Sequence, residues 1–179
     1  MAVTIRQAES APASYPPAPS GLSTAAAALD PAMVWQRVES YIAHRYSERD
    51  VEWVVEGPGE WVPPLAPAAI TTVEIWSCGA NTWEECEPNA SPLGGYWLPA
   101  TGPYRFSGQV GAGDVPASVD AAWSRLAEYL AAKPGTAGAT LELTRAGSVE
   151  SRKQRDASWM ASAMQNSGAA DLLRSFRRV

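Results

Sequence analysis

Histidine, cysteine and phenylalanine are scarce in this chain of 179 residues, which contains one, two and two of them respectively. Any Ser/His/Asp or Cys/His catalytic set would depend on His44, which lies off the apolar stripe of its expected helix and is better interpreted as a surface or subunit-contact residue. One histidine and two cysteines are too few for a strong zinc site, and glutamates near Cys86 offer at most weak cation binding. We therefore predict no enzyme, no catalytic residue, no cofactor and no metal ion.

Long apolar runs are also absent. No stretch of about 18 apolar residues occurs, so we expect no transmembrane helix and no membrane contact. The first residues lack the charge and the continuous apolar segment of a secretory signal. Cys78 and Cys86 could face each other across a hairpin, although reduced thiols are favoured in a cytoplasmic protein.

Tryptophan and charge are distributed unusually. Eight tryptophans are many for a chain of this size, and some are expected at contacts between chains, where tryptophan is enriched. From residue 145 onward, seven basic residues against three acidic ones give +4, so the preceding 144 residues carry −9 of the total of −5. Such a basic segment fits either an arm for a negatively charged partner or a solvated terminal helix, and charge alone does not separate the two.

Two amphipathic helices are predicted. Asp30 and Pro31 suit the start of the first, which runs to about Tyr46. Its apolar stripe excludes Glu39 and consists of Val34, Trp35, Val38, Tyr41 and Ile42. The second helix spans about 116–133, with a stripe formed by Val119, Ala122, Trp123, Leu126, Ala127 and Leu130.

Short strands are predicted between the helices, separated by turns at Gly57-Pro58-Gly59 and at 99–103. The clearest is ITTVEIWS at 70–77, and the two helices should pack on it. This gives an α+β fold: two main helices packed with a small antiparallel β region, an extended N-terminal arm and a helical C-terminal arm. The expected domains are an Ala/Pro-rich arm at 1–29, a connector domain at 30–144 and a basic arm at 145–179.

The order of these pieces carries a resemblance. A capped helix with VWQRVESYIAHRYS leads into a strand, followed by PPLAP, ITTVEIW, GGYWLPATGPYRF and VPASVDAAWSRLAEYLAA. In this order they resemble the head–tail connector (adaptor) proteins of long-tailed phages, in the version carried by phage-derived gene transfer agents. The similarity runs from about Asp30 to Ala132 and continues in WMASAMQNSGAADLLRSFRR.

The resemblance implies a structural protein that forms a ring, commonly of twelve copies, beneath a portal. The ring would extend the DNA channel without binding a DNA sequence and would dock a tail-side stopper or terminator ring. Assembly in the bacterial cytoplasm and release within a phage-like particle are implied. The C-terminal segment would contact the portal through Trp159, Met160, Met164, Leu172, Leu173, Phe176, Arg174, Arg177 and Arg178.

A second class of function stays open on the sequence alone. The chain could be a monomeric binding module, or a nucleic-acid accessory protein that uses its basic C-terminal arm. A ring on the portal would favour the connector, whereas a monomer that shifts DNA would favour the accessory protein.

Overall fold

The computed structural model describes residues 2–132, 139–145, 150–155 and 161–177. The chain divides into two compact units. The sheet unit comprises residues 1–15 and 43–114, and the helical unit comprises residues 16–42 and 115–177. The described residues contain no helix with both the length and the apolar character needed to cross a bilayer.

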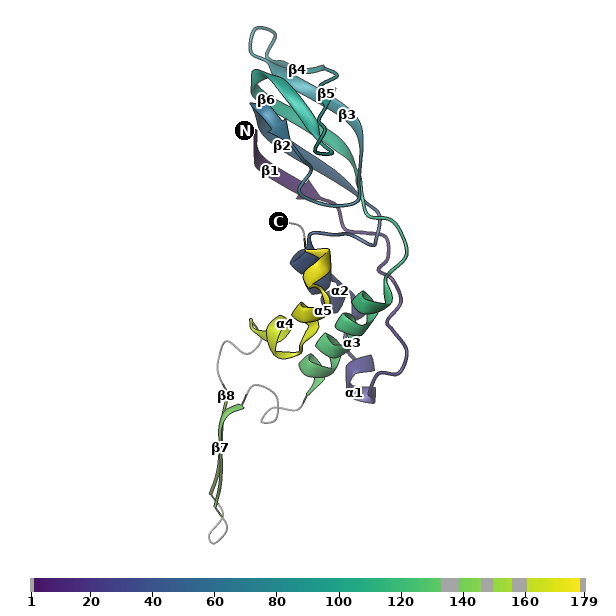
Figure 1. The fold of residues 1–179 in the computed structure, drawn as a ribbon, viewed down its shortest axis with the longest axis vertical. Coiled ribbons are helices and arrows are strands. Elements are labelled where there is room, and N and C mark those ends of the chain that lie inside the picture. Colours follow the sequence, from purple (N-terminus) through teal and green to yellow (C-terminus); the bar gives the residue numbers. More distant parts are fainter. Residues whose placement is uncertain (1, 133–138, 146–149, 156–160, 178–179) are drawn as a thin grey trace. The chain divides into compact units, whose positions relative to one another are not determined.

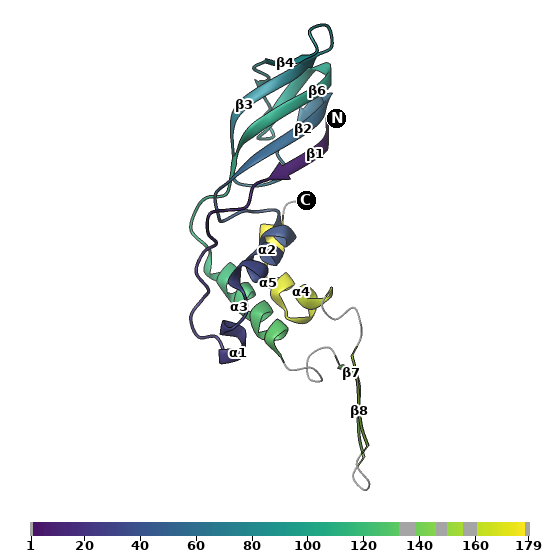
Figure 2. The same cartoon turned by 180° about the vertical axis from the view of Figure 1, so that it is seen from behind.

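The sheet unit is built on a six-stranded antiparallel sheet. Its strand order is β1-β2-β6-β3-β4, and the short β5 pairs with β6. Figures 1 and 2 show this sheet from opposite sides, with β6 between β2 and β3. The strands are β1 (Val3–Glu9), β2 (Arg49–Trp61), β3 (Ala68–Ser77), β4 (Thr82–Glu85), β5 (Asn89–Ala90) and β6 (Tyr96–Val110).

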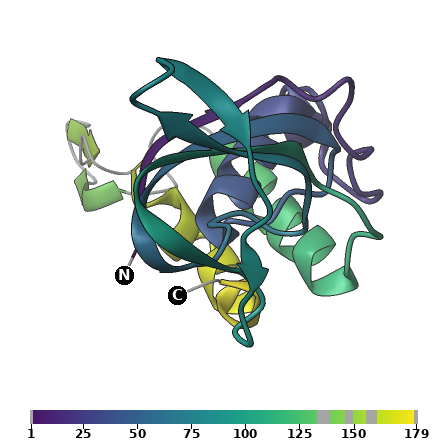
Figure 3. The same cartoon turned by 90° about the horizontal axis from the view of Figure 1, so that it is seen from above.

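The sheet has its own aromatic core. Alternate residues of β2 are buried, so that Val51, Trp53 and Val55 share one face while Asp50 and Glu52 share the other. The ring centroid of Trp61 lies 4.2 Å from that of Phe106 and 5.7 Å from that of Trp53. Viewed from above in Figure 3, the sheet curves strongly. Some of the tryptophans, such as Trp53 and Trp61, therefore belong to this core, whereas Trp97 is exposed.

The expected fold class is wrong, because the chain is rich in strands and its largest element is the six-stranded sheet. The expectation failed at proline and glycine residues that lie inside strands. Gly57-Pro58-Gly59, predicted as a turn, lies within β2, where the register against β6 shifts. The two short strands predicted around 99–103 are one strand, β6. Proline and glycine are tolerated within a strand at a β-bulge. Here they shift the pairing register between β2 and β6, but both strands continue past them.

The helical unit is organised around α3. Helix α3 contacts α1, α2, α4 and α5. Strands β7 and β8 form a separate antiparallel pair. The elements are α1 (Thr24–Ala27), α2 (Pro31–Ile42), α3 (Ala117–Ala131), β7 (Ala139–Arg145), β8 (Glu150–Arg155), α4 (Ala163–Asn166), α5 (Ala169–Leu172) and the 3₁₀ helix η1 (Arg174–Phe176).

Both predicted helices are present and most of their apolar stripes are buried, but the first helix ends at Ile42 and not near Tyr46, because Ala43 leaves the helical conformation with a φ of 54°. Val34, Val38 and Ile42 of α2 are fully buried, as are Val119 and Leu126 of α3. The expected packing of these stripes on the strand at 70–77 is not found, because that strand belongs to the sheet unit and its separate core. The chain thus has two cores where one was expected.

The first 29 residues are not simply an extended arm. Val3–Glu9 form β1, which pairs with β2. Ser23 caps α1, accepting a hydrogen bond from the Ala26 amide at 3.2 Å. The Ser23 amide and hydroxyl both donate to the Glu128 carboxylate at 2.7 Å and lower its pKa. Residues 10–22, which lie between β1 and the Ser23 cap and include the prolines, contain no helix or strand.

Candidate interaction surfaces

The β1 edge of the sheet exposes apolar side chains. Val3 and Ile5 are 57% and 65% exposed. They lie at the end of the sheet path, and Ile5 falls at a register shift against β2. Since an open strand edge also presents unpaired backbone groups, this edge is suited to contact another chain.

An apolar groove of about 480 Å³ adjoins this edge. Its floor includes Trp61, whose indole N–H donates to the Thr4 hydroxyl at 2.9 Å and so fixes the ring against β1. Leu93, from the loop before β6, is 71% exposed at the same groove. The groove is therefore lined by the fixed aromatic ring of Trp61 and by the accessible aliphatic side chains of Val3 and Leu93.

At the opposite edge, β3, β4 and β6 form an aromatic and charged cluster. The Trp76 and Trp83 rings meet edge to face at 5.3 Å, and the Arg105 guanidinium lies 4.7 Å from the Trp83 centroid. Arg105 donates two hydrogen bonds to Glu74, at 2.6 and 2.7 Å. These bonds hold the pKa of Glu74 below its ordinary value. Glu85, on β4, lies directly across from Glu74 in the ladder.

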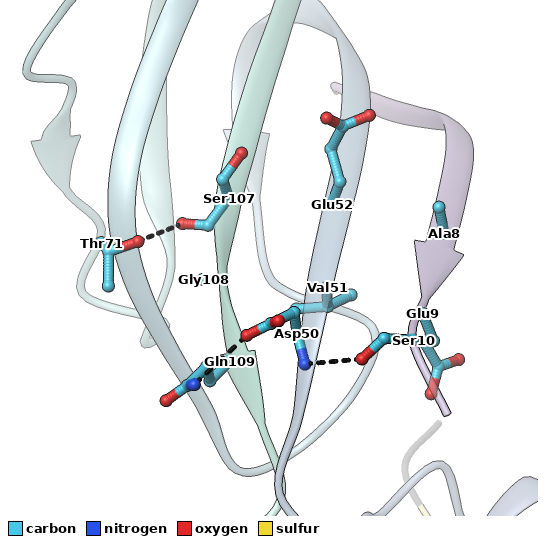
Figure 4. Close-up of a pocket in the computed structure, with 10 residues that line it drawn as sticks. All are labelled: Ala8, Glu9, Ser10, Asp50, Val51, Glu52, Thr71, Ser107, Gly108 and Gln109. Carbon is cyan, nitrogen blue, oxygen red and sulfur yellow. Dashed lines mark hydrogen bonds between the residues drawn. The ribbon is translucent and has the colours of Figure 1, made fainter. Parts of the chain in front are cut away.

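A shallow polar hollow lies on the sheet near the end of β1 (Figure 4). Its carboxylates already have protein partners. Asp50 accepts a hydrogen bond from the Gln109 amide at 3.2 Å, Glu52 pairs with Arg6, and Glu9 pairs with Arg45. Gly108 provides the close approach of β6 to β3 beside it. These contacts stabilise strand pairing, and they explain the hollow without a bound ligand.

Glu9 joins the end of β1 to a buried arginine pair. Its carboxylate accepts hydrogen bonds from Arg45 at 2.7 and 3.1 Å, and Arg49 lies 4.0 Å away. Both arginines are buried. Burial opposes ionisation of Glu9, but the hydrogen bonds and positive charges of the arginines outweigh it and lower the pKa of Glu9.

We expect Glu9→Gln to destabilise the sheet unit by about 2 kcal/mol at neutral pH, because charge-assisted bonds to a buried arginine are lost. Since the folded pKa of Glu9 lies below its ordinary value of 4.5, this contribution is present above that pH and disappears as the pH falls through the folded pKa. Urea unfolding at a series of pH values from about 7 downward should therefore show a difference between wild type and variant that shrinks as Glu9 of the wild type becomes protonated. A difference that stays constant with pH would contradict an ionic role for Glu9.

The helical unit has a groove of about 460 Å³ along the outer side of α2. Met33, Arg37 and Tyr41 line it from α2, and Met164 lines it from α4. The Arg177 guanidinium lies 4.9 Å from the centroid of the Tyr41 ring, a cation–π distance. The groove thus brings together side chains from the first predicted helix and from the predicted C-terminal arm.

The residues predicted to bind a portal are only partly accessible. Met164 and Leu173 are buried, and Leu172 and Phe176 are half-buried, so these apolar groups pack within the helical unit. Arg174 and Arg177 are exposed. Trp159, Met160 and Arg178 lie outside the described residues. An amphipathic stripe on a short helix looks the same in sequence whether its own chain or a partner covers it.

The scarce residues have ordinary surroundings. His44 is half-buried, its ring centroid lies 4.6 Å from that of Tyr46, and its backbone bridges to Ala66. Cys78 and Cys86 are free cysteines. Burial, with Glu74 and Glu85 nearby, raises the pKa of the Cys86 thiol. The described residues contain no group of three or more histidine, cysteine or acidic side chains placed to hold a metal ion.

Sequence reasoning missed the β1 edge. The available signal was the alternation of apolar Val3 and Ile5 with polar Thr4 and Arg6, which the nearby prolines obscured. The groove along α2 was missed because its partner residue, Met164, is distant in sequence. No protein-family model, no curated protein and no solved structure matches this chain.

Proposed function

We propose that this protein is a non-enzymatic head–tail connector, which forms a ring under a portal, extends the DNA channel and docks a tail. One observation carries the proposal: among the residues whose burial the structure describes, the large hydrophobic side chains that are exposed all lie on the sheet unit. They are Val3, Ile5, Leu93 and Trp97. Exposed apolar patches of this kind mark contacts with other proteins. The order of motifs from Asp30 to Ala132 supports the connector as the particular assembly.

The charge of the sheet supports passage of DNA. The face opposite the aromatic core bears Asp50, Glu52, Glu56, Glu74 and Glu85 against Arg6 and Arg105. Such a face repels phosphates and does not grip them. If it lines the channel, DNA can slide past it. The proposed setting is a phage-like particle assembled in the bacterial cytoplasm.

The portal contact is proposed on the exposed side of the C-terminal helices. Arg174 and Arg177 remain accessible there, with the half-buried Phe176 between them. Because Leu173 is part of the core, removal of residues 158–179 would uncover α3 and damage folding. Point substitutions therefore test this contact better than truncation.

The first experiment is mass measurement and electron microscopy of the full chain mixed with the portal of its particle. We expect a closed ring, about twelve copies by the resemblance, stacked on the portal. A chain that stays monomeric beside the portal and shifts DNA would replace the connector by the nucleic-acid accessory protein.

A second experiment reverses the two exposed charges. We expect Arg174→Glu with Arg177→Glu to weaken portal binding and to reduce its salt dependence, since peripheral charges chiefly affect association rate. Loss of the Arg177–Tyr41 stacking should cost no more than about 1 kcal/mol of stability. Sedimentation with portal rings at several salt concentrations measures the effect, and Gln165→Glu, at an exposed site on α4, is the control. Unchanged binding of the double variant would remove η1 from the portal contact.

A further inference from the structure

The sheet has two open ends that run in the same direction. As far as the described residues show, its path begins at β1 and ends at β4. All neighbouring pairs along this path are antiparallel, so the first and fifth strands point the same way. A neighbouring copy related by rotation about a ring axis would therefore place its β4 parallel to β1.

One cross-strand row connects these two ends. The register pairs Arg6 with Val54, Val54 with Arg105, Arg105 with Glu74, and Glu74 with Glu85. The row begins with a basic residue on β1 and ends with an acidic residue on β4. Arg6 pairs with Glu52, yet its side chain is 64% exposed, so further donors of the guanidinium are accessible.

Glu85 ends the row beside a like charge. It lies directly opposite Glu74, and like charges at that position are unfavourable. Arg105 uses its Nε and Nη2 donors in a bidentate pair with Glu74. A basic group arriving on the outer side of β4 would relieve the repulsion on Glu85.

In the same register, a second pair of residues on the two edges would also come together, and both of its members are apolar. Val3 is exposed and lies three residues before Arg6 on β1, but the register shift between Thr4 and Arg6 leaves them only two ladder positions apart. Their partners on β2, Glu56 and Val54, are two residues apart. Trp83 lies two residues before Glu85 on β4 and is half-buried. Alignment of Arg6 with Glu85 therefore also brings Val3 to Trp83, because both strands run in the same direction.

We infer that a second copy of this chain covers the β1 edge, with β4 of one copy joining β1 of the next and Glu85 beside Arg6. The inference rests on the proposed ring and names the contact that would build it. A head-to-tail contact between two different edges generates a ring when the rotation between copies closes, as the proposed connector requires, whereas two β1 edges would form a two-fold dimer. The two-fold pairing centred on the strand would set Arg6 against Arg6, which charge disfavours.

A charge exchange tests the pairing. We expect Arg6→Glu and Glu85→Arg each to reduce the ring fraction at least tenfold, and the double variant to restore it. Glu84→Arg is the matched control, because Glu84 is an exposed neighbour whose side chain alternates to the opposite face of β4. Combined with Arg6→Glu it should give no rescue. The readout is native mass spectrometry of the full chain with and without portal, with melting curves to confirm folding.

Cysteine cross-linking tests the geometry without relying on charge. In a chain carrying Cys78→Ser and Cys86→Ser, Arg6→Cys with Glu85→Cys should form ladders of linked copies on oxidation. Dimers from Arg6→Cys alone would overturn the inference in favour of the two-fold pairing. Rings that persist in all charge variants without ladders would also overturn it, while leaving the connector intact. Absence of any ring on the portal would instead refute the proposed function.

Discussion

Leu126→Ala is expected to destabilise the helical unit by about 2–5 kcal/mol, the range for truncation of a fully buried leucine. Leu126 is fully buried in α3, the helix that contacts α1, α2, α4 and α5. Because the sheet unit has its own core, the loss should be confined to the helices. Hydrogen exchange followed by mass spectrometry measures both effects: peptides of α3 should lose protection, and peptides of β2 and β6 should keep it.

Leu130→Ala is the matched control for this prediction. It removes the same atoms from the same helix, but Leu130 is half-buried and the cavity it leaves is open to water. We expect a clearly smaller loss. Equal losses for the two variants, or an equal loss of protection in the sheet, would contradict the separate core of the helical unit.

Gly111→Ala should destabilise the sheet unit by about 2–5 kcal/mol, combining backbone strain with overpacking. Gly111 has a φ of +99°, and a Cβ there would lie 2.2 Å from the Ser47 carbonyl oxygen. Its amide donates to the Pro67 carbonyl at 3.1 Å, which holds this close approach in place. Denaturant unfolding followed by tryptophan fluorescence measures the change, since Trp53 and Trp61 lie in the core of the sheet unit.

Gly113→Ala separates the two causes. Gly113 has a φ of +90°, but nothing lies within 4 Å of its added Cβ. This variant should cost only the strain, about 1–2 kcal/mol. If the two variants lose the same stability, the close approach at Ser47 is not a constraint, and only the backbone conformation matters.

The spacing of apolar residues was sufficient to predict those elements whose buried side chains recur at a regular interval. The stripes of α2 and α3 recur at helical spacing, and their central residues are buried as expected. The strand at 70–77 was also predictable, because it is rich in β-branched and aromatic residues. These elements depend on side chains close in sequence, so their pattern appears without knowledge of the fold.

Long-range pairing was not predictable in the same way. β1 joins the sheet only because β2, more than 40 residues later, offers it a partner, and prolines inside β2 and β6 read locally as turns. β8 was missed because SRKQR has no apolar alternation. Glu39, assigned to the polar side of its helix, is buried, so burial on α2 extends beyond the predicted stripe.

The sequence by itself determined the two amphipathic helices, the strand at 70–77 and the contrast between an acidic body and a basic C-terminal segment. Only the tertiary structure decided that these elements form two units, that Met164 and Leu173 are core residues, and that Arg6 and Glu85 end one row across the sheet. The reason is physical. Helical periodicity is set by neighbours within one turn, whereas strand register and burial depend on segments that meet only after the chain has folded.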